Sequence, residues 1–493
     1  MKNPVLIFLL IFILSVICHH AACQNPTFSF KYATGFDEVP THAVETADGG
    51  YIISAKQGTM EPYSSHVLFI RLNQWGDTIK TAATYDSTGN CFIYQIIPCD
   101  DGNYFAIGTW QYSPDEMNIW LMKMNENLEV LWEKKFSTNC YELDIALGLV
   151  DHSSNLILYG NGRFGSLSDN ALVVIRCNQT GDSINEVRLT QTSHYAMVYE
   201  MAEKPDSSGF YLLIGGRFQV NTNSWGQILK LDTTLNLVDI DSIPGQLFHY
   251  HNILILGNKL FITGSRPYLA AHPFTVKLGF LQLDTAYQIQ REHYSGPDDT
   301  VSYPGYIHNL SMIDTSYFYY GGTLNQDNNA IFSPKKTWYM LGKYDAGLNL
   351  IWQKFYGGNS NYGLWSLNVT IDGGCLLAGS AYDYVTQDNE RDICILKVDS
   401  GGIITGDSGD SQKLIHDAVV YPNPGSDQLT VRSGPQVSGA VMQVTEISGH
   451  QVYQTTLSDN LTVIEAESWL SGTYIWQIIY QDQVIESGKW IKY

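Results

Sequence analysis

Short runs of alternating aliphatic and aromatic residues, each preceded by a tight-turn sequence, recur along most of the chain. DGGYIISA at 48–55 returns as DGNYFAIG at 101–108 and as DGGCLLAG at 372–379. Such runs, bounded by Gly and Asp, are typical of β-strands that follow hairpin turns. Weaker copies of the run lie at 153–160, 207–216, 257–264 and 315–322.

A second and a third strand are expected after each of these runs. The second strands are VLFIRLN (67–73), IWLMKMN (119–125), ALVVIRCN (171–178), QILKLD (227–232), LGFLQLD (278–283), WYMLGKYD (338–345) and ICILKVD (393–399). The third is clearest in LWEKKF (131–136) and IWQKFYGG (351–358). Units of four short strands that repeat every ~50 residues are typical of β-propellers. We therefore predict an all-β chain with a seven-bladed β-propeller over residues 25–406.

The two ends of the repeated region are expected to meet in one blade. The last unit lacks its aromatic outer strand, whereas FSFKY (28–32) resembles the KF and KFYGG strands of other units. An open array would leave unpaired strand edges exposed. We therefore expect residues 28–32 to complete the seventh blade.

The flanking segments indicate a leader, a linker and a second domain. The apolar run at 5–18 is shorter than the ~20 residues of a spanning helix, so residues 1–24 are predicted to be a secretory signal peptide. No later segment is apolar enough over that length to span a membrane. DSGDSQKLIHD makes residues 407–417 a linker, and the alternating pattern of 418–493 predicts a small Ig-like β-sandwich.

The motifs of this second domain carry a family resemblance. VVYPNPGSDQLTV (419–431), LSGTYIWQI (470–478) and the terminal GKWIKY follow one another in order. They resemble the C-terminal (type A) sorting domain of type IX secretion cargo in Bacteroidetes-type bacteria. The resemblance implies that the outer-membrane secretion machinery is a partner and that the protein is secreted or placed on the cell surface. It implies that the recognition surface contains Tyr421, Pro422, Asn423, Pro424, Gly449, Gly472, Tyr474 and Lys492.

Composition agrees with an exported all-β protein. Charged residues make up 16% of the chain, which contains 32 Tyr, 11 Trp and 43 Gly, and the formal net charge is −21. This charge argues against a nucleic-acid partner, because phosphate binding depends on Lys and Arg. Six cysteines remain after the signal peptide, and Cys375 with Cys394 is the disulfide we expect first. Free buried cysteines are the alternative.

Motifs of catalysis or of cofactor binding are absent, and no cofactor is implied. The sequence contains no H-E-x-x-H, G-x-S-x-G, P-loop or C-x-x-C pattern. The repeated Asp-Gly pairs are explained as hairpin turns. The remaining cluster of reactive residues is His42, Glu200, His251 and His308, which all fall on predicted innermost strands around the central channel. Such residues can bind a ligand or metal or transfer protons, or they can simply face the water of the channel.

Two further patterns bear on function. Aromatic residues near predicted strand ends, such as Trp75, Trp110 and Trp225, can stack on sugar rings or protein surfaces, although packing is the simpler explanation. Asp-[Ser/Thr]-hydrophobic triplets resemble the O-glycosylation acceptor pattern of exported Bacteroidetes proteins, and turns again explain them more simply. The acceptor hydroxyls would be those of Thr78, Ser183, Ser242, Thr285 and Thr300.

These observations favour a binding protein over an enzyme. We expect an exported propeller that binds a glycan or a protein ligand. The alternative is a polysaccharide hydrolase or lyase with its site at the channel mouth, around His42, Glu200, His251 and His308. A structural component of the cell surface is a third possibility.

Overall fold

The computed structural model describes most of the chain between Asn25 and the C-terminus. The described residues are 26–59, 65–84, 90–113, 116–140, 142–163, 170–191, 196–217, 224–243, 247, 249–268, 275–297, 300–326, 332–385, 389–404, 419–421, 425–432, 439–446, 448–457, 461–480 and 483–493. The predicted signal peptide (1–24) and linker (407–417) lie outside them. The chain forms two compact units, of which the first ends at Asp407 and the second at Tyr493.

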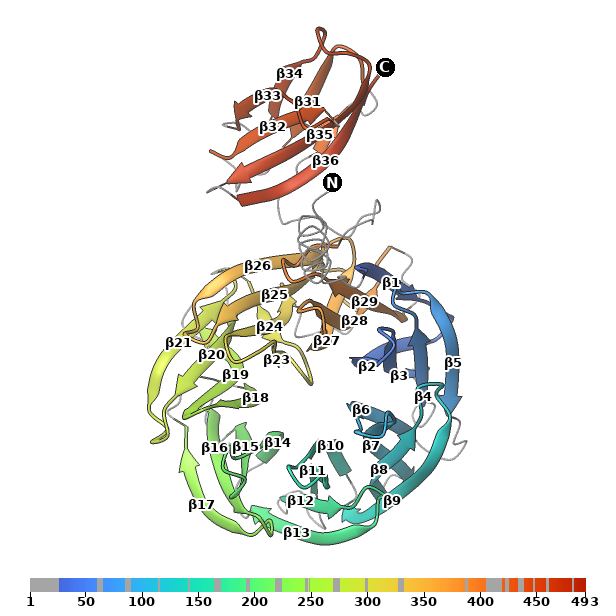
Figure 1. Cartoon of the computed structure of the whole chain (residues 1–493), viewed down its shortest axis with the longest axis vertical. Coiled ribbons are helices and arrows are strands. Elements are labelled where there is room, and N and C mark those ends of the chain that lie inside the picture. The colour runs from blue at the N-terminus through green and yellow to red at the C-terminus, as the bar shows by residue number, and fades with distance from the viewer. Residues whose placement is uncertain are drawn as a thin grey trace, which may run out of the picture. The chain divides into compact units, whose positions relative to one another are not determined.

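The described part of the first unit folds into seven antiparallel sheets arranged as a ring, the geometry of a β-propeller (Figure 1). Sheet 1 contains β2 (Asp37–Glu45), β3 (Tyr51–Gly58), β4 (His66–Leu72) and β5 (Thr78–Thr84). Sheet 2 contains β6 (Asn90–Pro98), β7 (Tyr104–Ser113), β8 (Glu116–Met124) and β9 (Val130–Cys140). Sheet 3 contains β10 (Glu142–Val150), β11 (Leu156–Arg163), β12 (Asn170–Cys177) and β13 (Ser183–Gln191).

The remaining sheets continue around the ring. Sheet 4 contains β14 (Ala196–Glu203), β15 (Gly209–Arg217), β16 (Ser224–Asp232) and β17 (Leu237–Ser242), and sheet 5 contains β18 (His249–Leu256), β19 (Lys259–Tyr268), β20 (Thr275–Leu283) and β21 (Ile289–Ser295). Sheet 6 contains β22 (Ser302–Pro304), β23 (Leu310–Met312), β24 (Tyr317–Leu324), β25 (Trp338–Asp345) and β26 (Leu350–Gly357). Sheet 7 contains β27 (Asn361–Val369), β28 (Cys375–Tyr382), β29 (Arg391–Val398) and β1 (Phe28–Tyr32).

The strand from the start of the ring pairs with the last strand, as the sequence predicted. β1 runs antiparallel to β29, with Phe28 opposite Lys397 and Tyr32 opposite Ile393. Phe28 is buried and belongs to a hydrophobic cluster that also contains Leu68 and Ile395. Segments more than 360 residues apart are therefore joined by ladder hydrogen bonds, which remove one open strand edge.

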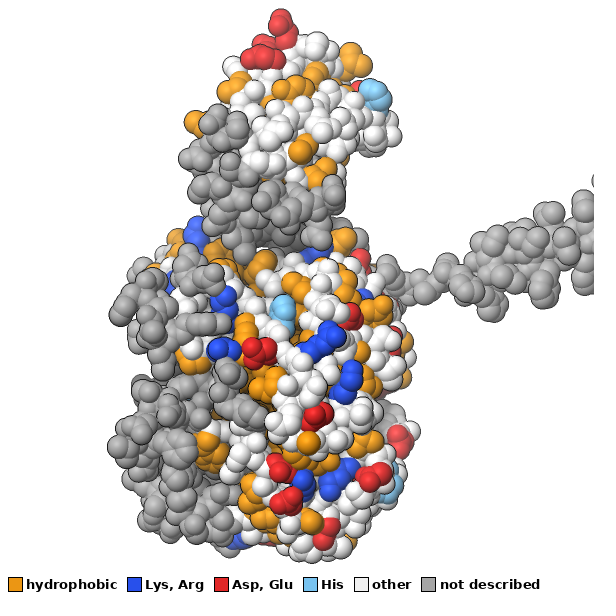
Figure 2. Space-filling model, turned by 90° about the vertical axis from the view of Figure 1, so that its left-hand side faces the viewer, with side chains coloured by type: hydrophobic (Ala, Val, Ile, Leu, Met, Phe, Trp, Pro, Cys, Tyr) orange, Lys and Arg blue, Asp and Glu red, His pale blue; other side chains and the backbone are white. Residues whose placement is uncertain are grey.

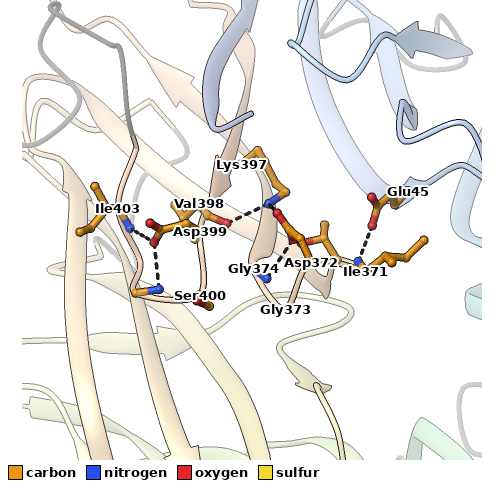
Figure 3. A network of polar contacts seen from close by, with 12 residues as sticks. Glu45, Ile371, Asp372, Gly373, Gly374, Lys397, Val398, Asp399, Ser400 and Ile403 are labelled. Carbon is orange, nitrogen blue, oxygen red and sulfur yellow. Dashed lines mark hydrogen bonds and ion pairs between the residues drawn. The ribbon is translucent and has the colours of Figure 1, made fainter. Parts of the chain in front are cut away.

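Ion pairs of a largely buried cation explain why a turn aspartate recurs together with a [Lys/Arg]-x-[Asp/Asn] sequence. The aspartate of the first hairpin turn pairs with a cation near the end of the third strand of the same sheet. The pairs are Asp48–Arg71 (2.6 Å), Asp101–Lys123 (2.6 Å), Asp151–Arg176 (3.4 Å) and Asp372–Lys397 (2.9 Å). Lys397 is fully buried, and its ammonium group also donates to the carbonyl oxygen of Val398 at 3.1 Å (Figure 3). A buried charge is tolerated only when it is paired in this way.

The Asp or Asn that ends each third strand caps the next hairpin. Its side-chain oxygen accepts the backbone N–H groups two and four residues later, for example those of Gly401 and Ile403 at Asp399. The same arrangement occurs at Asn73, Asn125, Asn178, Asp232, Asp284 and Asp345. The third residue after each has a positive φ, which suits Gly76 and Gly402. This capped turn explains why an Asp or Asn recurs at the end of each third strand.

The second unit consists of two antiparallel sheets in the described residues. One has the order β30 (Val419–Tyr421), β31 (Gln428–Arg432), β34 (Leu461–Glu465). The other has the order β33 (Gln451–Thr456), β32 (Val441–Glu446), β35 (Gly472–Tyr480), β36 (Gln483–Lys492). Leu429, Met442, Ile478 and Trp490 are fully buried and form a core with residues of both sheets.

The disulfide expected between Cys375 and Cys394 is not formed. Both cysteines are free and buried, as are Cys91 and Cys177. In the β28–β29 register Cys375 lies opposite Val398, whereas Cys394 lies opposite Gly379. Four residues of strand separate the two positions, at about 3.4 Å per residue, and a disulfide requires Cα atoms within about 7 Å. Adjacent strands were predicted correctly, but their register keeps the two thiols apart.

Within the described part of the chain, no helix has the length and apolar character needed to cross a membrane.

We predict that Asp372→Asn destabilises the first unit by about 3–5 kcal/mol, because it leaves Lys397 charged, buried and without its counter-ion. Urea unfolding of the full chain measures this change. The matched control is Asp182→Asn, which affects an exposed pair with Lys134 and should have a much smaller effect. Equal effects of the two substitutions would contradict the proposed role of the buried pair.

Candidate functional site

The innermost strands of the ring share a β-bulge. The register shifts between Pro40 and His42 in β2, Ile93 and Gln95 in β6, Leu143 and Ile145 in β10, Val198 and Glu200 in β14, Tyr250 and Ile253 in β18, and Leu364 and Ser366 in β27. A bulge re-aims the side chains around it. In β6 the bulged residue is Tyr94, and the polar residue Gln95 follows it. In β27 the bulged residue is Trp365, and Ser366 follows it.

The polar residue next to the bulge binds the backbone of the following sheet. His42 Nδ1 accepts the N–H of Ile96 at 3.2 Å, and Gln95 Oε1 accepts that of Gly148 at 2.8 Å. Glu200 Oε2 accepts the N–H of Ile253 at 3.0 Å. Asn252, within the bulge of β18, accepts that of Asn309 at 2.9 Å. We call His42, Gln95, Glu200 and Asn252 the inter-sheet residues.

Sheet 6 departs from the pattern by sending a segment into the centre of the ring. β22 and β23 both pair with β24, and the residues between them, 305–309, bulge out of the sheet, while Gly305 and Asn309 at the two ends stay hydrogen-bonded to Gly321 of β24 (Figure 1). Ile307 N–H donates to the carbonyl oxygen of Trp365 at 2.9 Å, and Leu367 N–H donates to that of His308 at 2.7 Å. We call residues 305–309 the plug.

The plug also contacts sheet 5, the neighbour of sheet 6 on the side away from sheet 7. Asn252 Nδ2 lies 3.3 Å from the Ile307 carbonyl oxygen, and Thr263 donates to Asn309 Oδ1 at 2.8 Å. The Ile307 side chain is buried in a cluster with Leu147 of β10 and Val198 of β14. Sheets 3, 4, 5 and 7 therefore all hold this segment.

His308 of the plug meets His42 of sheet 1. Their ring centroids are 4.6 Å apart at an interplanar angle of 66°, and both side chains are buried. Burial lowers the pKa of His308 to about 4. Burial, with a smaller contribution from His308, lowers the pKa of His42 well below its usual range. Both imidazoles are therefore neutral near pH 7.

Glu200 and His251 belong to a different part of the centre. Glu200 Oε2 accepts a second hydrogen bond from Asn252 Nδ2 at 2.7 Å, and burial raises its pKa to about 7. The His251 ring lies 5.9 Å from that of Tyr199 and hydrogen-bonds the backbone of Tyr306, while burial lowers its pKa to about 3. The structure thus joins His42 to His308 but gives Glu200 and His251 separate partners. The described residues contain no group of three or more His, Cys, Asp or Glu able to hold a metal ion.

Aromatic side chains surround the plug. Tyr306 of the plug stacks on Trp365, with centroids 4.6 Å apart and planes at 28°, and 52% of Tyr306 is exposed. The bulged residues Tyr199 and His251 contact each other, and His251 hydrogen-bonds the backbone of Tyr306. Tyr94 of β6 packs on the same core cluster as Trp365. We call Tyr94, Tyr199, His251, Tyr306 and Trp365 the aromatic collar.

Tyr94, Tyr199 and Trp365 lie on the innermost strands β6, β14 and β27, whereas Tyr306 lies between strands and was not predicted from the sequence. Gly305, directly after Pro304, was the available signal, because Pro and Gly together interrupt a strand. Of the tryptophans expected near strand ends, Trp75 is exposed, whereas Trp110 and Trp225 are half-buried.

The outer rim of the ring has a hollow between two neighbouring sheets. It measures about 550 Å³ and is lined by Arg291, Glu292 and His293 of β21 and by residues 347–350 of the β25–β26 turn. On the side of the ring that Figure 2 draws, acidic and basic side chains alternate with hydrophobic ones. This hollow is open and lies on outer strands, apart from the collar.

Two residues of the sorting motifs have interior roles. Tyr474 is buried, and its hydroxyl donates to the Leu470 carbonyl oxygen at 2.6 Å. Lys492 Nζ is buried and donates to the carbonyl oxygens of Ala466 at 2.6 Å and Glu467 at 3.0 Å. These bonds hold the segment before β35 in place, which is a folding function.

The other sorting residues are placed as follows. Gly449 has a φ of 86° in the β32–β33 turn, and Gly472 begins β35 opposite Lys492. Tyr421 ends β30 opposite Thr430. Pro422, Asn423 and Pro424 lie outside the described residues.

The hydroxyls of the Asp-[Ser/Thr] triplets are mostly accessible. Thr78 and Ser183 are exposed at the equivalent first positions of β5 and β13, and Ser242 and Thr285 are exposed as well. Thr300 is half-buried.

We predict that acid destabilises the first unit through His308. The folded state keeps this histidine neutral while the unfolded chain protonates it below pH ~6.5, so stability falls as pH falls. Between pH 7.5 and 5 the loss is about 2 kcal/mol for one such histidine. Glu200 acts in the opposite direction, because its raised pKa gives stability that is lost as pH rises through about 7.

Comparing the full chain with His308→Gln isolates the histidine contribution, since the Glu200 contribution cancels. The measurement is the urea midpoint from pH 7.5 to 5, with the exposed His450→Gln of the second unit as control. An unchanged pH slope in His308→Gln would contradict the assignment.

Comparison with known proteins identifies the second unit. Residues 419–492 match the family model of the secretion system C-terminal sorting domain. No curated protein sequence matches the chain. Among solved structures, hydrazine synthase of Kuenenia stuttgartiensis is similar at 12% identity and a TM-score of 0.43, over 73% of this chain and 95% of that one.

Two further similar structures are the β-propeller domain of the trilobed protease of Pyrococcus furiosus and the polysaccharide lyase Uly1. The first has 8% identity and a TM-score of 0.42, covering 73% of this chain and 93% of its own. The second has 9% identity and a TM-score of 0.44, covering 76% and 100%. Similarity at this level leaves function open. The chain is thus a β-propeller region followed by a type IX secretion C-terminal sorting domain, which marks it for export to the cell surface or for secretion.

Proposed function

We propose that this chain is an exported seven-bladed β-propeller that binds a glycan or protein ligand on its aromatic collar. The observation that carries the proposal is Tyr306, half exposed and stacked on Trp365 at the centre of the ring. An exposed ring held flat by a second ring offers a large contact area with little loss of conformational entropy on binding.

Delivery is proposed to depend on the second unit, an Ig-like sandwich. The signal peptide at 1–24 directs the chain across the inner membrane, and the outer-membrane type IX machinery recognises residues 418–493. Cleavage within the linker at 407–417 then leaves the domain at 25–406 attached to the surface or released. The sorting-domain match over 419–492 supports this route.

O-glycosylation is proposed at the exposed hydroxyls of Thr78, Ser183, Ser242 and Thr285, and at Thr300. The first two are the strongest, because both stand at the start of an outer strand and directly follow an exposed aspartate.

A polysaccharide hydrolase or lyase is the second candidate function, and Glu200 is the observation that favours it. Its pKa near 7 suits a general acid or base. The same oxygen, however, already accepts hydrogen bonds from Asn252 and Ile253. We therefore rank binding first. Glu200→Gln should leave ligand affinity unchanged in a binding protein and abolish turnover in an enzyme.

We predict that deleting residues 419–493 stops export. The deleted chain should accumulate in the periplasm, whereas the complete chain should reach the surface or the medium. Mass spectrometry of fractions from the native host measures this, and the exported form should begin near Gln24 and end between residues 406 and 420. Export of the truncated chain would refute the route.

We predict that Tyr306→Ala weakens ligand binding about tenfold or more, the equivalent of roughly 1.4 kcal/mol, while Tyr306→Phe loses less affinity than Tyr306→Ala because it keeps the ring. Calorimetric titration with a panel of oligosaccharides and peptides measures the affinities. Tyr317→Ala is the matched control, since Tyr317 is 39% exposed in the same sheet but outside the collar. An equal loss in both alanine variants would exclude the collar as the site.

A further inference from the structure

The groups around Tyr306 also indicate what kind of ligand the collar takes. We propose that the collar binds a neutral sugar ring, which stacks on Tyr306 and receives a hydrogen bond from its hydroxyl. This inference rests on the proposed binding function and narrows the ligand to one chemical class.

The stacked pair provides a flat apolar platform. Trp365 lies against one face of Tyr306 at a ring-centroid distance of 4.6 Å, and the two planes are only 28° from parallel. About half of Tyr306 is open to solvent. The C–H face of a pyranose matches such a surface, because aromatic rings bury apolar area while their polar edge stays available.

Hydrogen bonding leaves a donor for the ligand. Gln326 Nε2 donates to the Tyr306 hydroxyl oxygen at 3.2 Å. The hydroxyl oxygen is thus used as an acceptor, and its own proton can be donated to a sugar hydroxyl. The Gln326 side-chain oxygen adds an acceptor beside it. A few polar groups at the edge of an apolar surface are what orient a small ligand.

The charges near Tyr306 favour an uncharged ligand. Among the described residues, the polar side chains that hydrogen-bond Tyr306 are the Gln326 amide and the His251 imidazole, and burial keeps this imidazole neutral. An acidic sugar would need Arg or Lys for its carboxylate or sulfate. The chain as a whole carries 49 acidic and 28 basic residues, which repels such ligands.

A cation does lie near another part of the collar. Lys56 Nζ stands 5.9 Å from the centroid of Phe92, whose ring contacts Tyr94 at 4.8 Å. Burial lowers the pKa of Lys56, and the nearby Asp37 opposes this shift. Asp37 is itself held by Arg391 at 2.7 Å. Asp37 thus faces two cations, Lys56 and Arg391, and these three charges belong to the contact between sheets 1 and 7, not to the surface of Tyr306.

The plug makes the platform rigid before the ligand arrives. The residues on both sides of Tyr306 are fixed, Ile307 by the hydrogen bond to Trp365 and Gly305 by its N–H, which donates to Gly321 at 3.2 Å. His251 binds the backbone of Tyr306 itself. Such preorganisation lowers the entropy lost on binding. Two stacked rings fit one or two sugar residues, whereas a stable protein interface needs about 800 Å² on each partner.

The test is calorimetric titration of the full chain with neutral oligosaccharides of glucose, galactose, mannose and xylose, and with uronic-acid and sulfated oligosaccharides of the same length. We expect at least one neutral series to bind, with an affinity that changes less than about twofold between 50 and 500 mM NaCl. Tyr306→Ala should weaken it tenfold or more. Tyr306→Phe should weaken it severalfold by removing the hydroxyl donor, and Gln326→Ala should have a similar effect.

The outcomes separate the two proposals. Binding of acidic oligosaccharides or of peptides alone, still lost in Tyr306→Ala, would overturn the neutral-sugar inference and leave the collar as a binding site. A neutral sugar whose binding is unaffected by Tyr306→Ala would overturn both. Thermal melting and the Tyr317→Ala control show whether a variant has lost its fold, and Tyr306→Phe keeps the test valid if the alanine variant does not fold.

Discussion

The hydrogen bonds between neighbouring innermost strands hold the centre of this ring together. Each innermost strand presents backbone N–H groups that no strand of its own sheet can pair, and a buried unpaired donor costs about 1–3 kcal/mol. Side chains of the inter-sheet residues supply the acceptors at Ile96, Gly148, Ile253 and Asn309. The β-bulge makes this possible, because it turns one polar side chain toward the next sheet and leaves the residue before it beside the plug.

This constraint changes the interpretation of reactive side chains near the axis. His42 and Glu200 occupy equivalent positions, and Gln95 shares them with the same bond geometry. An amide, an imidazole and a carboxylate can replace one another there because the position requires only an acceptor. Their pKa shifts follow from burial. The side chains beside these buried acceptors are aromatic, and the plug provides the most exposed of them, Tyr306.

In the second unit, polar side chains of the identifying motifs likewise bond to the backbone of their own domain. Tyr474 and Lys492 belong to the motifs by which the sorting domain is identified, and both direct their polar atoms to carbonyl oxygens of residues 466–470. They act on the fold of the signal.

The strands and hairpins of this protein could be predicted from the sequence, because short-range interactions determine them. The alternation of side chains, the Asp-Gly turns and the capping Asp or Asn residues specify strands and hairpins through short-range interactions, and the aromatic strand at 28–32 was correctly expected in the last sheet. The register of β28 and β29, which keeps Cys375 from Cys394, depends on pairing along whole strands. The course of residues 305–309, and with it the stack of Tyr306 on Trp365, depends on sheets that lie far apart in the chain. Only the tertiary structure could decide these, because closing the ring brings together groups that no local pattern relates.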